Sequence, residues 1–130
     1  MLLDVLTDYL AKVETSLQSL KNCHFEKYEE EILTPDRANL RVRVRFSKGH
    51  LLELNEAVII DSGKLGHLSY RYHFQDENNT LMFRYDNTPH FPDIEIFPHH
   101  KHLPNQVIST KKPKIPDAIQ EVKEYFLSKP

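Results

Sequence analysis

The sequence is poor in cysteine and glycine and has no long apolar run, and each shortage excludes a class of protein. Its one cysteine, Cys23, cannot form an internal disulfide or a cysteine-rich zinc site, so we expect a reduced, cytoplasmic setting. Its three glycines do not form a glycine-rich phosphate-binding loop, and no serine nucleophile elbow is present. No apolar run reaches the roughly 18–20 residues that span a bilayer, so we expect no membrane partner.

An excess of charge of one sign is also lacking. The 17 Lys and Arg residues nearly balance the 19 Asp and Glu residues, and the formal net charge is −2. Any contact with nucleic acid must therefore come from a local patch of basic side chains. With 130 residues, 39% hydrophobic and 28% charged, the chain suits one ordered domain over residues 1–130. The eight histidines are the unusual feature of the composition, and four of them fall between His90 and His102.

Apolar residues recur at steps of three and four near both ends of the chain. This is the spacing of a helix with one buried face. It predicts an N-terminal helix over residues 2–21 and a C-terminal helix over residues 116–128. Pro116 suits the first turn of the second helix, because a residue there needs no backbone N–H partner.

Between the two helices the apolar period changes to two, which indicates strands. The alternation and the short turns predict an antiparallel sheet within residues 24–86. We therefore expect an α+β fold, in which a sheet of about five strands packs against the two helices in two layers. Aromatic residues of the last two strands share the apolar phase, which favours the core over a base-stacking surface: Tyr70, Tyr72, Phe74, Phe83 and Tyr85.

Residues 87–114 form a proline- and histidine-rich segment. Its five prolines prevent a helix or a central strand from running far. A connection of this length inside a small domain is commonly functional. The segment follows directly after the last predicted strand.

Polar side chains of the last two predicted strands should lie side by side if these strands pair as a hairpin. Arg71 and His73 then sit near Arg84 and Asp86, because cross-strand neighbours are about 5 Å apart. If the histidine-rich segment folds back over the same polar face, imidazoles, a carboxylate and a guanidinium gather in one place. The candidate catalytic residues are His73, Arg84, Asp86, His90, His99 and His100, and the candidate substrate-binding residues are Arg71, Lys101, His102, Arg43 and Arg45.

Such a set suits the cleavage of RNA without a metal ion. The reaction needs a base for the 2′-hydroxyl, an acid for the leaving oxygen and a cation for the phosphate charge in the transition state. Two histidines can act as base and acid near neutral pH, and arginine binds two phosphate oxygens at once. We expect His73 to share the acid–base work with one of His90, His99 or His100. Arg84, together with Lys101, should bind the phosphate, and Asp86 should orient a histidine.

Basic residues alternate along one earlier strand, at Arg41, Arg43 and Arg45. One interpretation is a track for a phosphate backbone. The other is cross-strand pairing with Glu53 and Glu56 of the next strand. Both interpretations are open at this point.

Three blocks of the sequence carry a resemblance to a known family. They are Tyr70-Arg71-Tyr72-His73-Phe74-Gln75-Asp76, Phe83-Arg84-Tyr85-Asp86-Asn87-Thr88-Pro89-His90 and Phe97-Pro98-His99-His100-Lys101-His102. On these blocks the sequence resembles the TumE family, small prokaryotic proteins classed as toxins of type II toxin–antitoxin systems. The family motifs carry over as His73, Arg84, Asp86, His90, His99, His100, Lys101 and His102.

The resemblance implies a small cytosolic protein that is encoded beside an antitoxin and harms the host cell when unrestrained. The cognate antitoxin is therefore the expected partner. Many small toxins cleave mRNA on an antiparallel sheet flanked by helices, so RNA is the expected substrate by fold-level analogy. The net charge of −2 argues against the ribosome-bound action of many strongly basic toxins. The sequence is also compatible with a homodimer.

Two other functions remain open. In one, the chain is a non-catalytic module whose polar sheet face and proline-rich segment dock a protein partner. In the other, it is a metal-dependent hydrolase that uses the histidines of residues 90–102 together with Asp86. The expected cofactor is none for the ribonuclease and a divalent metal for this last alternative.

Overall fold

The computed structural model describes residues 2–88 and 98–128, and within them the chain forms two helices and one sheet. In chain order the elements are α1 (Leu2–Leu17), β1 (Cys23–Thr34), β2 (Arg37–Phe46), β3 (Leu51–Asp61), β4 (Lys64–Gln75), β5 (Leu81–Asp86), β6 (His100–Leu103), β7 (Gln106–Ser109) and α2 (Ile115–Leu127). The strands lie in the sheet in the same order as in the chain, and each neighbouring pair is antiparallel. The predicted α+β class with two terminal helices is confirmed.

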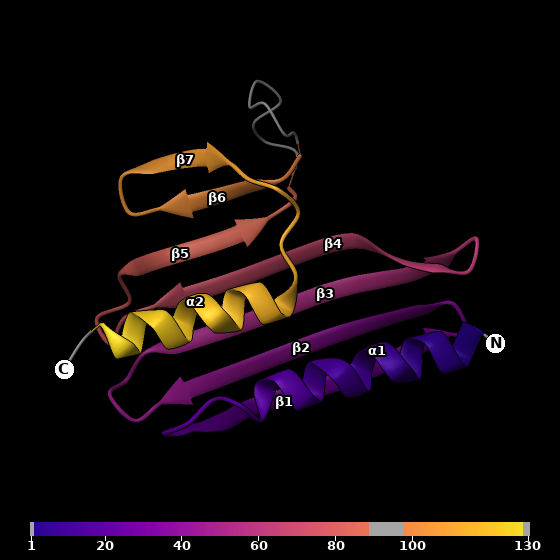
Figure 1. Cartoon of the computed structure of the whole chain (residues 1–130), viewed down its shortest axis with the longest axis horizontal. Helices are drawn as coiled ribbons and strands as arrows, with labels where there is room; N and C mark the ends of the chain where they lie inside the picture. The colour runs from indigo at the N-terminus through magenta and orange to yellow at the C-terminus, as the bar shows by residue number, and fades with distance from the viewer. Residues whose placement is uncertain (1, 89–97, 129–130) are drawn as a thin grey trace.

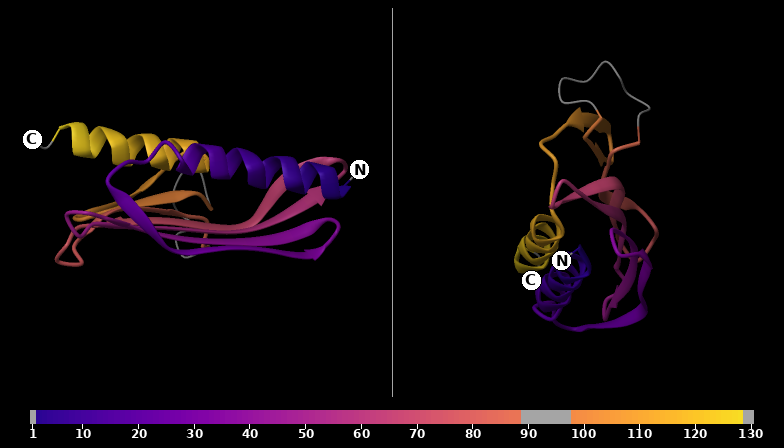
Figure 2. Two further views of the ribbon diagram at one scale, coloured as in Figure 1. Left: turned by 90° about the horizontal axis from the view of Figure 1, so that it is seen from below. Right: turned by 90° about the vertical axis from the view of Figure 1, so that its right-hand side faces the viewer.

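Both helices pack against the same face of the sheet, as the end view in Figure 2 shows, and they lie in front of the strands in Figure 1. In the described part of the chain the opposite face carries no helix, and we call it the open face. Residues of β2, β3 and β4 alternate between buried and half-exposed positions, so the buried set faces the helices. Burial of this apolar face is the main stabilising term of the fold.

The aromatic residues of β4 and β5 belong to the core under the helices, as predicted. Tyr70, Tyr72, Phe74 and Phe83 are buried, and Tyr85 is half-buried against the same cluster. Their rings are therefore not available as a base-stacking surface.

The N-terminal helix is shorter than predicted, because it ends at Leu17 and not at residue 21. Leu20 continues the apolar spacing and is buried, but it reaches the core from a turn whose backbone N–H bonds the carbonyl of Leu17. Asn22 then adopts a left-handed backbone conformation, with φ of 57°, which an Asn side chain tolerates at a chain reversal. The helical spacing of apolar residues thus continues to Leu20, three residues beyond the end of α1.

The sheet has seven strands in the described residues and not about five, because β6 and β7 lie inside the proline-rich segment. Each of these strands is only four residues long. The prolines lie outside them: Pro98 precedes β6, Pro104 occupies the turn between them and Pro113 precedes α2. Proline restricts strand length here without preventing strands, and the sheet continues to residue 109 and not to residue 86.

Candidate active site on the open face

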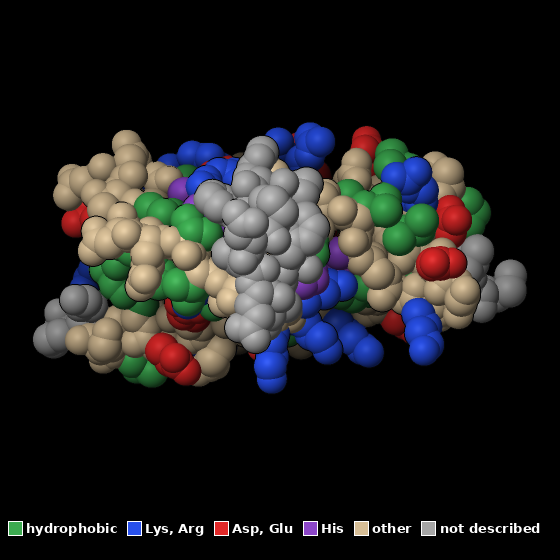
Figure 3. Space-filling model, turned by 90° about the horizontal axis from the view of Figure 1, so that it is seen from above, with side chains coloured by type: hydrophobic (Ala, Val, Ile, Leu, Met, Phe, Trp, Pro, Cys, Tyr) green, Lys and Arg blue, Asp and Glu red, His purple; other side chains and the backbone are tan. Residues whose placement is uncertain are grey.

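Two rows of polar side chains cross three neighbouring strands on the open face. Strand pairing aligns them across β4, β5 and β6, with His73, Arg84 and His102 in one row and Arg71, Asp86 and His100 in the other. We call these six residues the open-face cluster. The pairing of β4 with β5 follows the prediction, and β6 adds two histidines because residues 100 and 102 share one side of an extended strand. Seen from the β7 edge, histidine side chains lie beside Lys and Arg side chains (Figure 3).

The carboxylate of Asp86 is the centre of this cluster. Its Oδ1 lies 2.5 Å from His100 Nε2, and its Oδ2 lies 3.5 Å from His102 Nε2 and 3.6 Å from Arg84 Nε. Asp86 and His100 are buried, whereas the side chains of His102 and Arg84 are 17% and 29% exposed. Asp86 therefore holds two groups that remain accessible from solvent.

The two outer histidines of the first row are set to be neutral near pH 7. Burial lowers the pKa of His73, and the positive charges of Arg71 and Arg84 lower it further, against a hydrogen bond with Gln75. Burial also lowers the pKa of His102, with Arg84 adding to the effect and Asp86 opposing it. Both histidines therefore titrate below their usual value of 6.5.

His99 and Lys101 do not join the open-face cluster, although the sequence analysis grouped them with it. The ring of His99 stacks on Tyr70, and its Nδ1 lies 2.7 Å from the Tyr70 hydroxyl on the helix side of the sheet. Lys101 Nζ donates to Glu121 Oε2 of α2 at 2.8 Å and lies 4.9 Å from the Tyr85 ring centroid. The reason is alternation, because neighbours of His100 in an extended chain point to the opposite face.

Replacing Lys101 with alanine should lower the free energy of unfolding by about 1–2 kcal/mol. The change removes a half-buried, charge-assisted hydrogen bond to Glu121 and a cation–π contact with Tyr85. Urea unfolding followed by circular dichroism measures it. The matched control is Lys12→Ala on the exposed side of α1, which should change stability by less than about 0.5 kcal/mol. Equal effects of the two changes would contradict the anchoring role of Lys101.

The basic stripe on β2 is held largely by acidic partners. Arg43 Nε lies 2.8 Å from Glu26 and its Nη1 lies 3.3 Å from Glu53, while Arg45 Nε lies 3.1 Å from Glu26. The predicted pairing with Glu53 is thus present, and Glu26 of β1 is a partner that the sequence analysis did not name. His90 lies outside the described residues.

Pairing of the stripe with Glu56 is wrong, because Glu56 faces the helices and is buried. Tyr9 donates to its Oε1 at 2.5 Å, Tyr72 donates to its Oε2, and His67 Nε2 lies 2.9 Å from Oε2. Burial and the carboxyl group raise the pKa of both tyrosines well above the usual range. This network was not predicted from the sequence, although Glu56 shares the phase of its buried neighbours Leu54 and Val58.

A polar groove of about 260 Å³ lies beside the open-face cluster. Arg71 belongs to both, and the groove continues past Asn55 to Arg41, with Asn87 and Thr88 at its other side. The groove therefore places the guanidinium groups of Arg71 and Arg41 along a line that runs from the open-face cluster across β3 to β2.

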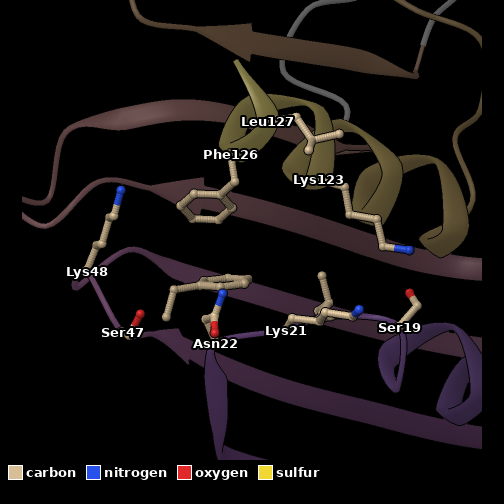
Figure 4. A pocket seen from close by; sticks show the side chains of 10 residues that line it. Ser19, Lys21, Asn22, Ser47, Lys48, Lys123, Phe126 and Leu127 are labelled. Atoms are coloured by element: carbon tan, nitrogen blue, oxygen red, sulfur yellow. The ribbon is translucent and has the colours of Figure 1, made fainter. Parts of the chain in front are cut away.

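A larger groove of about 490 Å³ lies elsewhere, where the C-terminal ends of the two helices meet the turn between β2 and β3. Phe46 and Phe126 form part of its apolar lining, and Lys21, Lys48 and Lys123 reach it from three different segments (Figure 4). No member of the open-face cluster lines this groove.

In the comparison with protein families, a family described as "Toxin TumE" matches residues 13–127. The chain belongs to the TumE toxin family. No curated protein and no solved structure matches the chain. Membership makes this TumE protein a toxin of a toxin–antitoxin module, for which a cognate antitoxin is the plausible partner. In the described residues of this TumE protein, neither helix has the length and apolar character needed to cross a bilayer.

Proposed function

We propose that this toxin is a metal-independent endoribonuclease whose active site is the open-face cluster. The observation that carries the proposal is the row in which Arg84 lies between His73 and His102. Adjacent strands are about 4.8 Å apart, so the backbone positions of His73 and His102 lie about 10 Å apart, with Arg84 between them. That span accommodates a phosphate with one hydrogen bond of about 2.8 Å at each side.

The chemistry follows from the order of groups in this row. One neutral imidazole takes the proton of the ribose 2′-hydroxyl, whose oxygen attacks the phosphorus, and the opposite imidazolium gives a proton to the departing 5′-oxygen. The products are a 2′,3′-cyclic phosphate and a free 5′-hydroxyl. Arg84 binds the phosphate oxygens and stabilises the charge that they gain in the transition state.

His102 takes the acid–base role beside His73 in this proposal, in place of His90, His99 or His100. His100 is 1% exposed, and its ring nitrogens face the carbonyl of Pro98 and the carboxylate of Asp86. It therefore positions Asp86 without touching substrate. Asp86 in turn holds His102 and Arg84 from behind, as expected of a group that orients a catalytic side chain.

The polar groove between Arg71 and Arg41 extends the proposed site along the substrate. Its lining includes the guanidinium groups of Arg71 and Arg41 and the amides of Asn55 and Asn87. Such groups contact phosphate and ribose without selecting a base, which suits a single-stranded RNA. We place the activity in the cytoplasm, and it needs no second copy because one chain supplies both rows.

Arg84→Ala should reduce RNA cleavage by about a hundredfold to a thousandfold, because one fixed cation of the transition state is lost. The assay incubates the full chain with single-stranded RNA, with and without EDTA, and follows the products on a gel. EDTA should leave the wild-type rate unchanged. The matched control is Arg37→Ala, an exposed arginine at the start of β2, which should cleave at the wild-type rate.

Three results would contradict this proposal. Equal rates for wild type and Arg84→Ala would remove the open-face cluster as the active site, and absence of cleavage by the wild type would favour the non-catalytic binding module. Loss of cleavage in EDTA would instead identify a metal-dependent hydrolase.

A further inference from the structure

Three side chains of the open-face cluster have the composition and spacing of a metal site. Asp86, His100 and His102 each present a ligand atom, and these atoms all lie within 4.8 Å of one another. We propose that they bind one divalent transition-metal ion, for which Zn²⁺ is the best chemical match. Two imidazoles and a carboxylate are a common ligand set for Zn²⁺, and they leave a coordination position for water.

The environment of His100 supports this assignment. Its Nδ1 lies 3.0 Å from the carbonyl oxygen of Pro98, and its Nε2 lies 2.5 Å from Oδ1 of Asp86. A carbonyl only accepts hydrogen bonds, so the Nδ1 proton is assigned by this contact. Metal-ligating histidines characteristically donate one ring N–H to a backbone carbonyl and bind the metal through the other nitrogen. His100 is therefore oriented with Nε2 as the ligand.

Burial of the three ligand side chains also supports the metal site. The side chains of His100, Asp86 and His102 are 1%, 8% and 17% exposed, so a cation among them is shielded from solvent on most sides.

The positive charge of Arg84 weakens binding of a metal ion at this site. Its Nε lies 3.6 Å from Oδ2 of Asp86, so the guanidinium and the ion compete for the same carboxylate. Removing Arg84 should therefore tighten Zn²⁺ binding, whereas a role of Arg84 in maintaining the site would weaken it. This opposite sign separates electrostatic competition from structural support.

The effect on activity, unlike the metal site itself, rests on the proposed ribonuclease function. A metal ion on His102 Nε2 occupies the lone pair that the acid–base step needs, and it draws Asp86 away from Arg84. Zn²⁺ should therefore inhibit RNA cleavage, and a chelator should restore it.

Isothermal titration of the chelator-treated full chain with ZnCl₂ tests the metal site. Wild type and His24→Ala, an exposed histidine on β1, should bind one ion per chain with equal affinity. Asp86→Asn and His102→Ala should bind at least about tenfold more weakly, since each removes a ligand, and Arg84→Ala should bind several-fold more tightly. Circular dichroism verifies that each variant is folded. The proposed site would be overturned if the wild type did not bind Zn²⁺. It would also be overturned if Asp86→Asn and His102→Ala both bound Zn²⁺ with the affinity of the wild type.

A parallel cleavage assay distinguishes this proposal from the ribonuclease proposal. Zn²⁺ binding that depends on Asp86 and His102 in a protein without RNA cleavage would support the metal site and overturn only the enzyme. RNA cleavage by a protein that binds no Zn²⁺ would support the ribonuclease and overturn only the metal site. Cleavage that Zn²⁺ accelerates would overturn inhibition by the metal and the metal-independent mechanism together.

Discussion

His73→Ala and His102→Ala should each reduce RNA cleavage by between about a hundredfold and ten-thousandfold, the range that general acid–base catalysis contributes. Each change removes one of the two imidazoles that flank Arg84, and neither side chain belongs to the apolar core. The fold should therefore survive, as a wild-type circular dichroism spectrum would verify. His24→Ala, which removes an exposed histidine at the start of β1, is the matched control and should retain full activity.

The pH dependence of kcat/KM should identify which of the two histidines is the base. Burial holds both pKa values below 6.5, so kcat/KM should peak below pH 6.5. Above this value the acid has lost its proton and the rate falls, and at still lower pH the base becomes protonated and the rate falls again. The variant that lacks the base should lose the decline at low pH, and the variant that lacks the acid should lose the decline at high pH.

A profile that stays bell-shaped in both variants would contradict the assignment, because the remaining histidine alone cannot supply both limbs. A peak above pH 7 in the wild type would contradict the expected direction of the pKa shifts. Both outcomes are independent of the absolute rate.

Glu56→Ala should lower the free energy of unfolding by about 3–5 kcal/mol, which is the largest effect on stability that we expect from a polar residue of this fold. The change removes the acceptor of Tyr9 and Tyr72 and the partner of His67, and it leaves these groups unsatisfied between sheet and helices. A domain of this size is stable by about 5–15 kcal/mol, so the variant should lose roughly a fifth or more of its stability. Urea unfolding measures the loss.

The matched control for this change is Glu53→Ala on the same strand. Glu53 lies on the open face, 27% exposed, and pairs with Arg43 at 3.3 Å. A partly exposed ion pair contributes about 0–1 kcal/mol, so this variant should remain close to wild type. If Glu56→Ala proves no more destabilising than Glu53→Ala, the network around Glu56 does not hold α1 to the sheet.

Much of the open-face cluster was predictable from the sequence, because alternation of polar and apolar residues determines which side chains share a face of a sheet. Arg71, His73, Arg84 and Asp86 follow that rule, and their strands pair as expected. The placement of the later histidines was only partly predictable. A proline-rich segment lacks the repeated alternation from which a short strand can be recognised, and β6 contributes only four residues.

The buried network around Glu56 was not predicted for a different reason. A single carboxyl group in an apolar phase has no local partner, and the partners of Glu56 come from α1 and β4. His67 reaches it because pairing between β3 and β4 shifts by one residue between Ala57 and Val58. Such an irregularity reverses the face of every residue beyond it, and period-two spacing does not reveal it.

The alternation of β6 makes the chemistry of the open face depend on a single residue of strand alignment. His100 and His102 lie on the open face, whereas Lys101 lies on the helix side and donates a hydrogen bond to Glu121 of α2. A one-residue slip of β6 against β5 would turn both imidazoles toward the helices and present an amine in their place. The contact between Lys101 and Glu121 therefore fixes the alignment of β6 with β5. Through this contact, α2 determines which side chains of β6 lie on the open face.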